Sequence, residues 1–271
     1  DKFMKEKKVV FITGASSGFG LSIANKLASE GHTVYGTSRS PAKVKERVNF
    51  DLLQLDVSSD QSVRDCVRLL LSRTERIDDV INNAGVAVVG AIEETTLEQA
   101  KFQFETNFWG CVRVIKEVLP VLRRQRNGHI INIGSLAGLV GIPFQGFYTA
   151  SKHALEGYSK SLRYELEPFN IRVTVIEPGF FKTNIRHSSV SAAERISDYD
   201  GIRSKVLSAL SASAENAPPP EIVAELVSKI IQTKNPKFTY RVGNDARLLP
   251  ILNFFFPKIY NAGAKRKFQL P

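Results

Sequence analysis

A serine, a tyrosine and a lysine are the residues best placed to do chemistry in this sequence. Ser135 follows an apolar, β-branched run, Tyr148 comes thirteen residues later, and Lys152 lies four residues beyond the tyrosine. On a helix, residues four apart share one face. A nearby ammonium group lowers the pKa of a phenol, ordinarily about 10, toward values useful for proton transfer at neutral pH. Because Ser135 can hydrogen-bond a carbonyl or alkoxide oxygen, the trio predicts acid–base chemistry on such an oxygen.

Other uses of these residue types fit less well. A tyrosine and a lysine on one helix are more often an exposed surface pair, so the prediction needs support from the rest of the chain. A hydrolytic serine requires a histidine, and none of the four histidines has the context of a nucleophile elbow. No cluster of histidine, cysteine and acidic residues has metal-ligand spacing, so we expect no metal.

A glycine-rich segment near the N-terminus predicts a second binding element. It joins a short apolar run to a helical pattern, where glycines allow a tight turn and the helix start offers free N–H groups and a positive dipole. The spacing G-x-x-x-G-x-G differs from the common dinucleotide pattern and by itself also fits a plain turn. The strand–turn–helix context favours dinucleotide binding by Gly14, Ser16, Ser17, Gly18, Phe19 and Gly20.

The end of the second predicted strand indicates which dinucleotide is preferred. An acid there would accept from a ribose 2′-hydroxyl, whereas an arginine accommodates a 2′-phosphate. The sequence has Ser38 and Arg39 and no acid, which favours NADP(H) over NAD(H). The alternative is that Arg39 is a solvated loop residue.

The elements that must hold these residues alternate along the chain. Seven short apolar runs read as strands buried on both faces, and helical patterns lie between them. This alternation predicts an α/β fold: a single doubly wound Rossmann-type domain with a mainly parallel seven-stranded sheet and helices on both faces. The runs are 9–12, 33–35, 52–55, 80–81, 130–133, 173–176 and 238–242, and the main helical stretches are 19–30, 62–76, 97–124 and 148–166.

Length and composition agree with one folded domain and a distinct end. The chain has 271 residues, of which 43% are hydrophobic, so it is not disordered and can fill a sizeable core. We expect the domain to cover residues 4–249 and a C-terminal extension, 250–271, to pack on it. Residues 182–220 contain no predicted strand and read as a substrate lid. Two cysteines are too few for a disulfide scaffold and favour a reducing, cytoplasmic location.

The net charge of +10 raises the question of a polyanionic partner. Nine of the basic residues but only one acid lie in 226–271, so the excess belongs to the end of the chain. The basic and aromatic residues there do not form a convincing nucleic-acid stripe, and we expect no nucleic acid. The apolar run 248–256 is too short to cross a bilayer. Its basic flanks leave two readings open: peripheral membrane contact, or, as we prefer, packing over the active site or a neighbouring subunit.

Taken together, the motifs resemble those of the short-chain dehydrogenases/reductases over nearly the whole chain. The match rests on the glycine loop, Asp56-Val57, Asn82-Asn83-Ala84-Gly85, Asn107, Gly134-Ser135, Tyr148 with Lys152, and Pro178-Gly179. Two segments, 148–158 and 240–249, look like the hydroxysteroid and retinol dehydrogenase branch. Phe19 in place of the more usual isoleucine, and the bulky Phe180-Phe181, are mild departures.

The resemblance implies roles for individual residues. Tyr148 would be the acid/base, Ser135 would polarise the substrate carbonyl, and Lys152 would lower the tyrosine pKa and hold the nicotinamide ribose. Asn107 would support a proton-relay water. The remaining cofactor contacts would come from Asp56, Val57, Asn83, Ala84, Gly85, Pro178, Gly179, Phe181 and Thr183. The family also implies a homodimer or homotetramer formed through the long helices 97–124 and 148–166.

The substrate is indicated only by its class. The segment before Tyr148 and the residue Phe180 are rich in apolar side chains, which suit a hydrophobic carbonyl compound or alcohol, although about half of such residues should be core. The expected substrate contacts are Ser135, Leu136, Ile142, Phe144, Gln145, Tyr148 and Phe180. The branch resemblance implies a small steroid-, retinoid- or lipid-like substrate. A non-catalytic NADP(H)-sensing or interaction protein on the same fold is the alternative.

Overall fold

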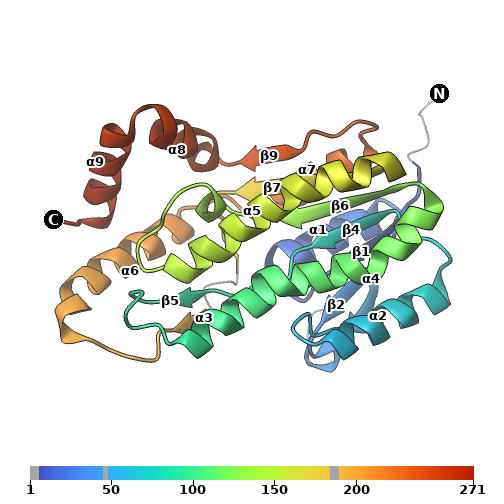
Figure 1. Ribbon diagram of the computed structural model, residues 1–271, viewed down its shortest axis with the longest axis horizontal. Coiled ribbons are helices and arrows are strands. Elements are labelled where there is room, and N and C mark those ends of the chain that lie inside the picture. The colour runs from blue at the N-terminus through green and yellow to red at the C-terminus, as the bar shows by residue number, and fades with distance from the viewer. Residues whose placement is uncertain (1–5, 45–47, 184–188) are drawn as a thin grey trace.

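The computed structural model describes residues 6–44, 48–183 and 189–271 and is built around a seven-stranded, fully parallel sheet. The strand order is β3-β2-β1-β4-β6-β7-β9 (Figure 1). Successive strands are added on one side of β1 up to β3 and on its other side from β4 onward, so the order of addition reverses between β1 and β4. In open α/β sheets, ligands bind beside the carboxyl ends of the strands at such a reversal. The strands are β1 (Val9–Ile12), β2 (Thr33–Ser38), β3 (Asp51–Gln54), β4 (Asp79–Asn82), β6 (Gly128–Ile133), β7 (Ile171–Pro178) and β9 (Thr239–Val242).

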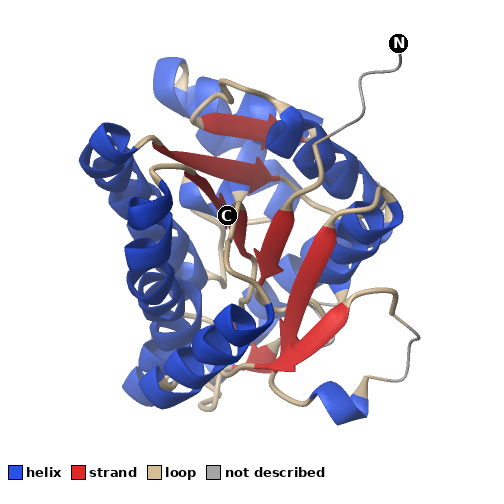
Figure 2. Cartoon of the chain, turned by 90° about the vertical axis from the view of Figure 1, so that its right-hand side faces the viewer, coloured by secondary structure: helices blue, strands red, loops and turns tan. Residues whose placement is uncertain are grey.

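Helices cover both faces of the sheet, as the doubly wound prediction requires. Successive strand side chains point to opposite faces: Phe11 packs with α2, α4 and α5, whereas Val10 and Ile12 pack with α1 and α7. Figure 2 shows the sheet between its helical layers. The predicted fold class is therefore confirmed. The helices are α1 (Gly18–Ser29), α2 (Asp60–Arg73), α4 (Gly110–Gln125), α5 (Gly146–Leu166) and α7 (Glu221–Gln232).

The helical stretch predicted over 97–124 is interrupted. It consists of α3 (Leu97–Phe104), a π-helical turn η2 (Glu105–Trp109) and α4. Asn107 lies in this wider turn, and its side chain bonds the backbone of Val86 and the Ser151 hydroxyl. Such turns often occur at functional sites. Periodicity misses the turn because one extra residue hardly changes the pattern of apolar positions.

The prediction that 182–220 contains no strand is wrong. A two-residue strand, β8 (Val190–Ser191), pairs in parallel with β5 (Val88–Val89), and both are too short to show a period. The segment also contains the long helix α6 (Asp200–Glu215). Residues 184–188 of the expected lid lie outside the described residues.

Two helices close the chain beside α6: α8 (Asn244–Phe255) and α9 (Pro257–Phe268). Figure 1 shows them at the end of the molecule away from the N-terminus. Ala246, Leu249 and Tyr260 pack with Leu136 and Phe180, and Phe268 packs against Val206 of α6. The boundary expected at residues 249 and 250 falls inside α8, since the apolar run continues the helix that begins after β9.

Candidate active site

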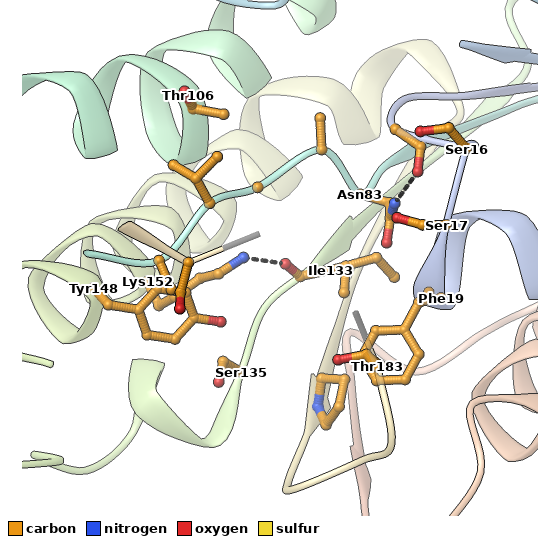
Figure 3. Close-up of a pocket in the computed structure, with 18 of the residues that line it drawn as sticks. Ser16, Ser17, Phe19, Asn83, Thr106, Ile133, Ser135, Tyr148, Lys152 and Thr183 are labelled. Carbon is orange, nitrogen blue, oxygen red and sulfur yellow. Dashed lines mark hydrogen bonds between the residues drawn. The ribbon is translucent and has the colours of Figure 1, made fainter. Parts of the chain in front are cut away.

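One cleft of about 860 Å³ runs along the carboxyl ends of the strands. It begins at the loop after β1 and ends at the start of α5, where Figure 3 shows Tyr148, Lys152 and Ser135 grouped together. The structure thus brings most of the predicted site residues into a single space. Those lining it are Gly14, Ser16, Ser17, Gly18, Phe19, Ser38, Arg39, Asp56, Val57, Asn83, Ala84, Gly85, Ser135, Leu136, Ile142, Gln145, Tyr148, Lys152, Pro178, Gly179, Phe180, Phe181 and Thr183.

The glycine loop is shaped by close backbone approaches. Gly14 and Gly18 have φ values of +68° and +55°, which favour glycine. A Cβ on Gly20 would lie 2.2 Å from the Gly14 carbonyl oxygen, so Gly20 packs the helix against the loop and does not itself line the cleft. Asn83 Nδ2 donates to the carbonyl oxygens of Thr13 and Gly14, at 3.0 and 2.9 Å. This amide therefore braces the loop from the neighbouring strand.

The start of α1 is free to bind an anion. Ser17, at the N-cap position, makes no side-chain capping bond, and the first turn holds no acidic residue. The unpaired N–H groups and the positive end of the helix dipole lie beside the cleft. The loop and helix together fit the diphosphate of a dinucleotide.

The half of the cleft that contains the glycine loop also carries a cation and a carboxylate at its far end. Ser38 is the last residue of β2 and Arg39 follows it, whereas Asp56 comes after β3. Burial opposes ionisation of Asp56, but hydrogen bonds from Ser58 to its Oδ1, at 2.9 and 2.6 Å, and the positive charge of Arg39 outweigh it, so the pKa of this carboxyl is lowered. Asp56 is thus an ionised acceptor.

Tyr148 and Ser135 face each other across the other end of the cleft (Figure 3). Ser135 Oγ accepts from the Ala137 N–H at 3.1 Å, which leaves the hydroxyl proton free to donate. Burial raises the pKa of the Tyr148 phenol, and the hydrogen bond with Ser135 partly offsets this. The two hydroxyls can therefore both donate to one substrate oxygen placed between them.

Lys152 lies one turn beyond Tyr148 on α5, as the spacing predicts. Its Nζ donates to the Ile133 carbonyl oxygen at 2.8 Å and lies 5.9 Å from the centroid of the Tyr148 ring. Burial lowers the pKa of Lys152 to about 8. Burial is the largest influence on the pKa of Tyr148, and the expectation that Lys152 lowers this pKa stays a prediction. The ammonium group is directed at the backbone of β6, and burial of the phenol dominates.

Besides Gly20, two predicted residues lie outside the cleft lining. Asn107 is buried beside it, where its Oδ1 accepts from the Val86 N–H at 2.8 Å and its Nδ2 donates to the Val86 carbonyl and Ser151 Oγ. Phe144 was expected among the substrate contacts. It is not part of the cleft lining but packs in one cluster with Val206 and Leu210 of α6 and Phe268 of α9, and its φ is positive, at 60°.

The sequence did not predict two features of the cleft: the part of its lining that comes from α6 and residues 43–44, and a hydrogen bond to Asp245 that holds another part of the lining in place. Leu207, Leu210 and Ala214 of α6 line the substrate end, and Lys43 and Val44 line the cofactor end. The spacing of Val206, Leu207 and Leu210 is helical, although the many serines and alanines around them dilute it. Asp245 Oδ2 accepts from the Phe180 N–H at 2.8 Å and so holds the Pro178–Phe180 segment. The only sign of this role in the sequence was that Asp245 is the single acid in the basic segment 226–271.

A buried pair of carboxyl groups lies behind the site. Glu156 on α5 hydrogen-bonds to Glu177 on β7, whose Oε2 accepts from Arg241 Nε at 3.0 Å. Burial, with the negative charge of Glu177, raises the pKa of Glu156 to about 8. Glu156 therefore holds a proton at neutral pH and donates it to Glu177.

This proton makes stability depend on pH. The folded chain keeps it up to about pH 8, whereas the unfolded chain releases it near 4.5, so the free energy of unfolding falls as pH rises between these values. Between about pH 5 and about pH 8, we expect the free energy of unfolding of the Glu156→Gln variant to fall by on the order of 1–3 kcal/mol less than that of the unsubstituted protein. Urea denaturation at both pH values measures this. Glu165→Gln, at an exposed position on the same helix, is the control, and parallel curves for all three proteins would contradict the assignment.

Comparison with known proteins agrees with this geometry. Residues 8–194 match the family model described as short chain dehydrogenase. A 3-ketodihydrosphingosine reductase from Bacteroides thetaiotaomicron is 40% identical over 93% of this chain and 92% of its own. Retinol dehydrogenase 8 from Bos taurus is 34% identical over 90% and 84%.

A solved structure shows the same architecture. The crystal structure of a short-chain dehydrogenase from Streptomyces avermitilis superimposes with a TM-score of 0.80 at 30% identity, covering 96% of this chain and 95% of that one. The overall architecture of the chain is therefore shared with that structure. The chain belongs to the short-chain dehydrogenase/reductase family and is an oxidoreductase of that family.

Proposed function

We propose that this protein is an NADP(H)-dependent oxidoreductase that interconverts a carbonyl and an alcohol on a hydrophobic, lipid-like substrate. The observation that carries the proposal is the single cleft that joins the glycine loop and Arg39 to the hydroxyls of Ser135 and Tyr148. A dinucleotide held by the first half would have its reactive end beside the second.

The substrate end of the cleft supports an apolar ligand. Its walls come from the Leu136 turn, the Ile142 loop, Phe180 and the α6 leucines, and its polar groups include Ser135, Gln145 and Tyr148. Few polar groups among apolar walls select the position of one oxygen on a largely hydrocarbon molecule. The names of two relatives, a 3-ketodihydrosphingosine reductase and a retinol dehydrogenase, also refer to lipid-like compounds.

The chain's own residues handle the proton and the orientation. A bound nicotinamide supplies or accepts the hydride. In reduction, Ser135 donates a hydrogen bond to the carbonyl oxygen and polarises it, and Tyr148 passes its hydroxyl proton to the same oxygen as negative charge develops there. Lys152, at the base of this group, would bind the ribose hydroxyls and attract the phenolate once it forms.

A panel of carbonyl compounds with NADPH tests the proposal. Long-chain 3-keto bases, retinal and keto-steroids are compared with short, water-soluble ketones, and NADPH oxidation is followed. We expect kcat/KM for at least one of the lipid-like compounds to exceed that for the short ketones by at least about tenfold, since added apolar surface is buried in the cleft. Absence of turnover with every carbonyl and with the corresponding alcohols would refute the proposal.

Arg39 is the residue whose substitution tests the cofactor preference. Removing its charge leaves a 2′-phosphate without its partner, so Arg39→Leu should raise KM for NADPH roughly ten- to hundredfold and KM for NADH by less than about threefold. Steady-state kinetics with both cofactors measure the difference. Arg68→Leu, which removes an exposed arginine on α2, serves as the control. Equal changes for the two cofactors would show that Arg39 does not recognise the phosphate.

We also propose a homo-oligomer formed through the α3–α4 segment and α5, in a reducing, cytoplasmic setting. Trp109 and Tyr164, from these two segments, are 47% and 66% exposed, which is high for large aromatic side chains. Both cysteines, Cys66 and Cys111, are free and buried. Light scattering of the purified chain gives the mass that tests the assembly.

A further inference from the structure

The outer side of α8 and α9 carries a concentrated set of exposed apolar side chains, which we call the apolar face. Phe254, Phe255 and Ile259 are 79%, 66% and 61% exposed. Leu248, Ile251 and Phe255 are spaced three and four residues apart, so they share one side of α8. The apolar face consists of Leu248, Ile251, Phe254, Phe255, Phe256 and Ile259.

These side chains are not part of the packing between the helices and the domain. That packing uses other residues: Ala246, Leu249 and Tyr260 meet the Leu136–Phe180 cluster, and Phe268 meets α6. The sides of α8 and α9 that face the domain are therefore already packed against it. An apolar surface of this kind, rimmed by polar residues, marks a binding surface.

The exposed charged residues of α8 and α9 are all basic. Arg247, Lys258, Lys265 and Arg266 are exposed on the same two helices, and residues 246–271 contain no aspartate or glutamate. Each lysine or arginine near an anionic lipid surface contributes favourably to binding, and apolar side chains beside them insert among the headgroups.

We propose that the apolar face docks the protein on the surface of an anionic phospholipid bilayer. Among the described residues, no helix is both long and apolar enough to pass through a membrane, so the contact is peripheral. The charge pattern favours a bilayer over a second copy of the chain. A two-fold contact through this face would bring identical basic rims together, whereas anionic headgroups complement them.

The position of the face connects it with the cleft. Lys267 Nζ lies 4.5 Å from the centroid of the Phe180 ring, and Phe268 packs in one cluster with Ile142 and Phe180, both of which line the substrate end. The helices that would rest on the bilayer thus pack behind residues that line that end. A lipid-like substrate would reach the cleft beside the membrane surface; this step rests on the proposed function, whereas the docking does not.

Flotation with vesicles tests the docking. The full chain is mixed with vesicles of phosphatidylcholine alone and with vesicles containing phosphatidylserine. We expect binding to the second kind that is at least about tenfold stronger and falls with added salt, because the basic rim contributes mainly through charge. No binding to phosphatidylserine vesicles would overturn the proposal.

Two double variants separate the contributions. Phe254→Gln/Phe255→Gln removes apolar surface and Lys265→Gln/Arg266→Gln removes charge, and each should weaken binding at least about tenfold. Leu69→Gln/Ile222→Gln and Lys234→Gln/Lys237→Gln remove exposed side chains of the same types elsewhere and should leave it unchanged. If the phenylalanine variant changes the mass in light scattering but not vesicle binding, the face is a contact between copies and the proposal fails.

Turnover measurements keep the two proposals distinct. With a short, soluble ketone, the phenylalanine variant should retain the unsubstituted rate. With a ketone carried in phosphatidylserine vesicles, its rate should fall at least about fivefold. Vesicle binding without turnover on any carbonyl would contradict the proposed function alone, whereas turnover without vesicle binding would contradict the docking alone.

Discussion

Tyr148→Phe is expected to lower turnover by about 10²- to 10⁴-fold while leaving NADPH affinity within about threefold of its original value. The substitution removes one oxygen and keeps the ring in its place on α5. Ser135 alone can still polarise a carbonyl, but no proton donor of suitable pKa remains beside the substrate oxygen. Single-turnover kinetics with the best ketone of the panel, together with titration of NADPH fluorescence, separate the chemical step from binding.

The matched control for this experiment lies on the same helix. Tyr164 is 66% exposed on α5, so Tyr164→Phe should change neither rate nor affinity. A Tyr148→Phe protein with the full rate would show that another group supplies the proton. The proposed acid/base role would then be wrong, although the cofactor half of the cleft would be unaffected.

Gly20→Ala is expected to have the second large effect, on the cofactor half. The added Cβ would lie 2.2 Å from the Gly14 carbonyl oxygen and 2.4 Å from Asn83 Nδ2. Neither group can move freely, since one is backbone and the other holds that backbone through two hydrogen bonds. We expect the free energy of unfolding to fall by about 1–3 kcal/mol and NADPH affinity to fall at least about tenfold, because the whole loop must shift.

Gly157→Ala supplies the control for a glycine-to-alanine change in a helix. Gly157 is exposed on α5 and a Cβ there meets nothing within 4 Å, so this variant should be more stable by about 0.5–1 kcal/mol. Thermal unfolding and NADPH titration of both variants measure the effects. Unchanged NADPH affinity in Gly20→Ala would mean that the loop does not bind the cofactor in the arrangement described.

Much of the fold was predictable because its signals are local. The strand β1 has the predicted bounds, since four apolar residues end at a glycine turn, and α5 begins only two residues before the prediction. Tyr148 and Lys152 both line the cleft because their spacing matches the helical repeat and places them on one side of α5. Ser135 was predictable for a different reason: a residue after a central parallel strand must lie at the ligand edge of the sheet.

The rest depended on contacts between distant parts of the chain. The pairing of β5 with β8 joins residues about a hundred positions apart through two residues each, which leaves no periodic pattern. Phe144 is apolar and close to Tyr148 in sequence, yet it has a positive φ and packs in one cluster with residues of α6 and α9. The position of the Lys152 ammonium group depends on the free carbonyl of Ile133, which sequence spacing does not reveal.

The clamp between Asp245 and the Phe180 N–H ties α8 to a cleft whose two halves have different origins. The cofactor half comes mainly from the first 85 residues, whereas the outer substrate wall comes from α6 and from segments that α8 and α9 hold in place. These two halves can therefore be exchanged separately. A chimera that receives α6, α8 and α9 from a relative, with Asp245 and Gly179 retained, should acquire a new substrate range and keep its original choice of cofactor.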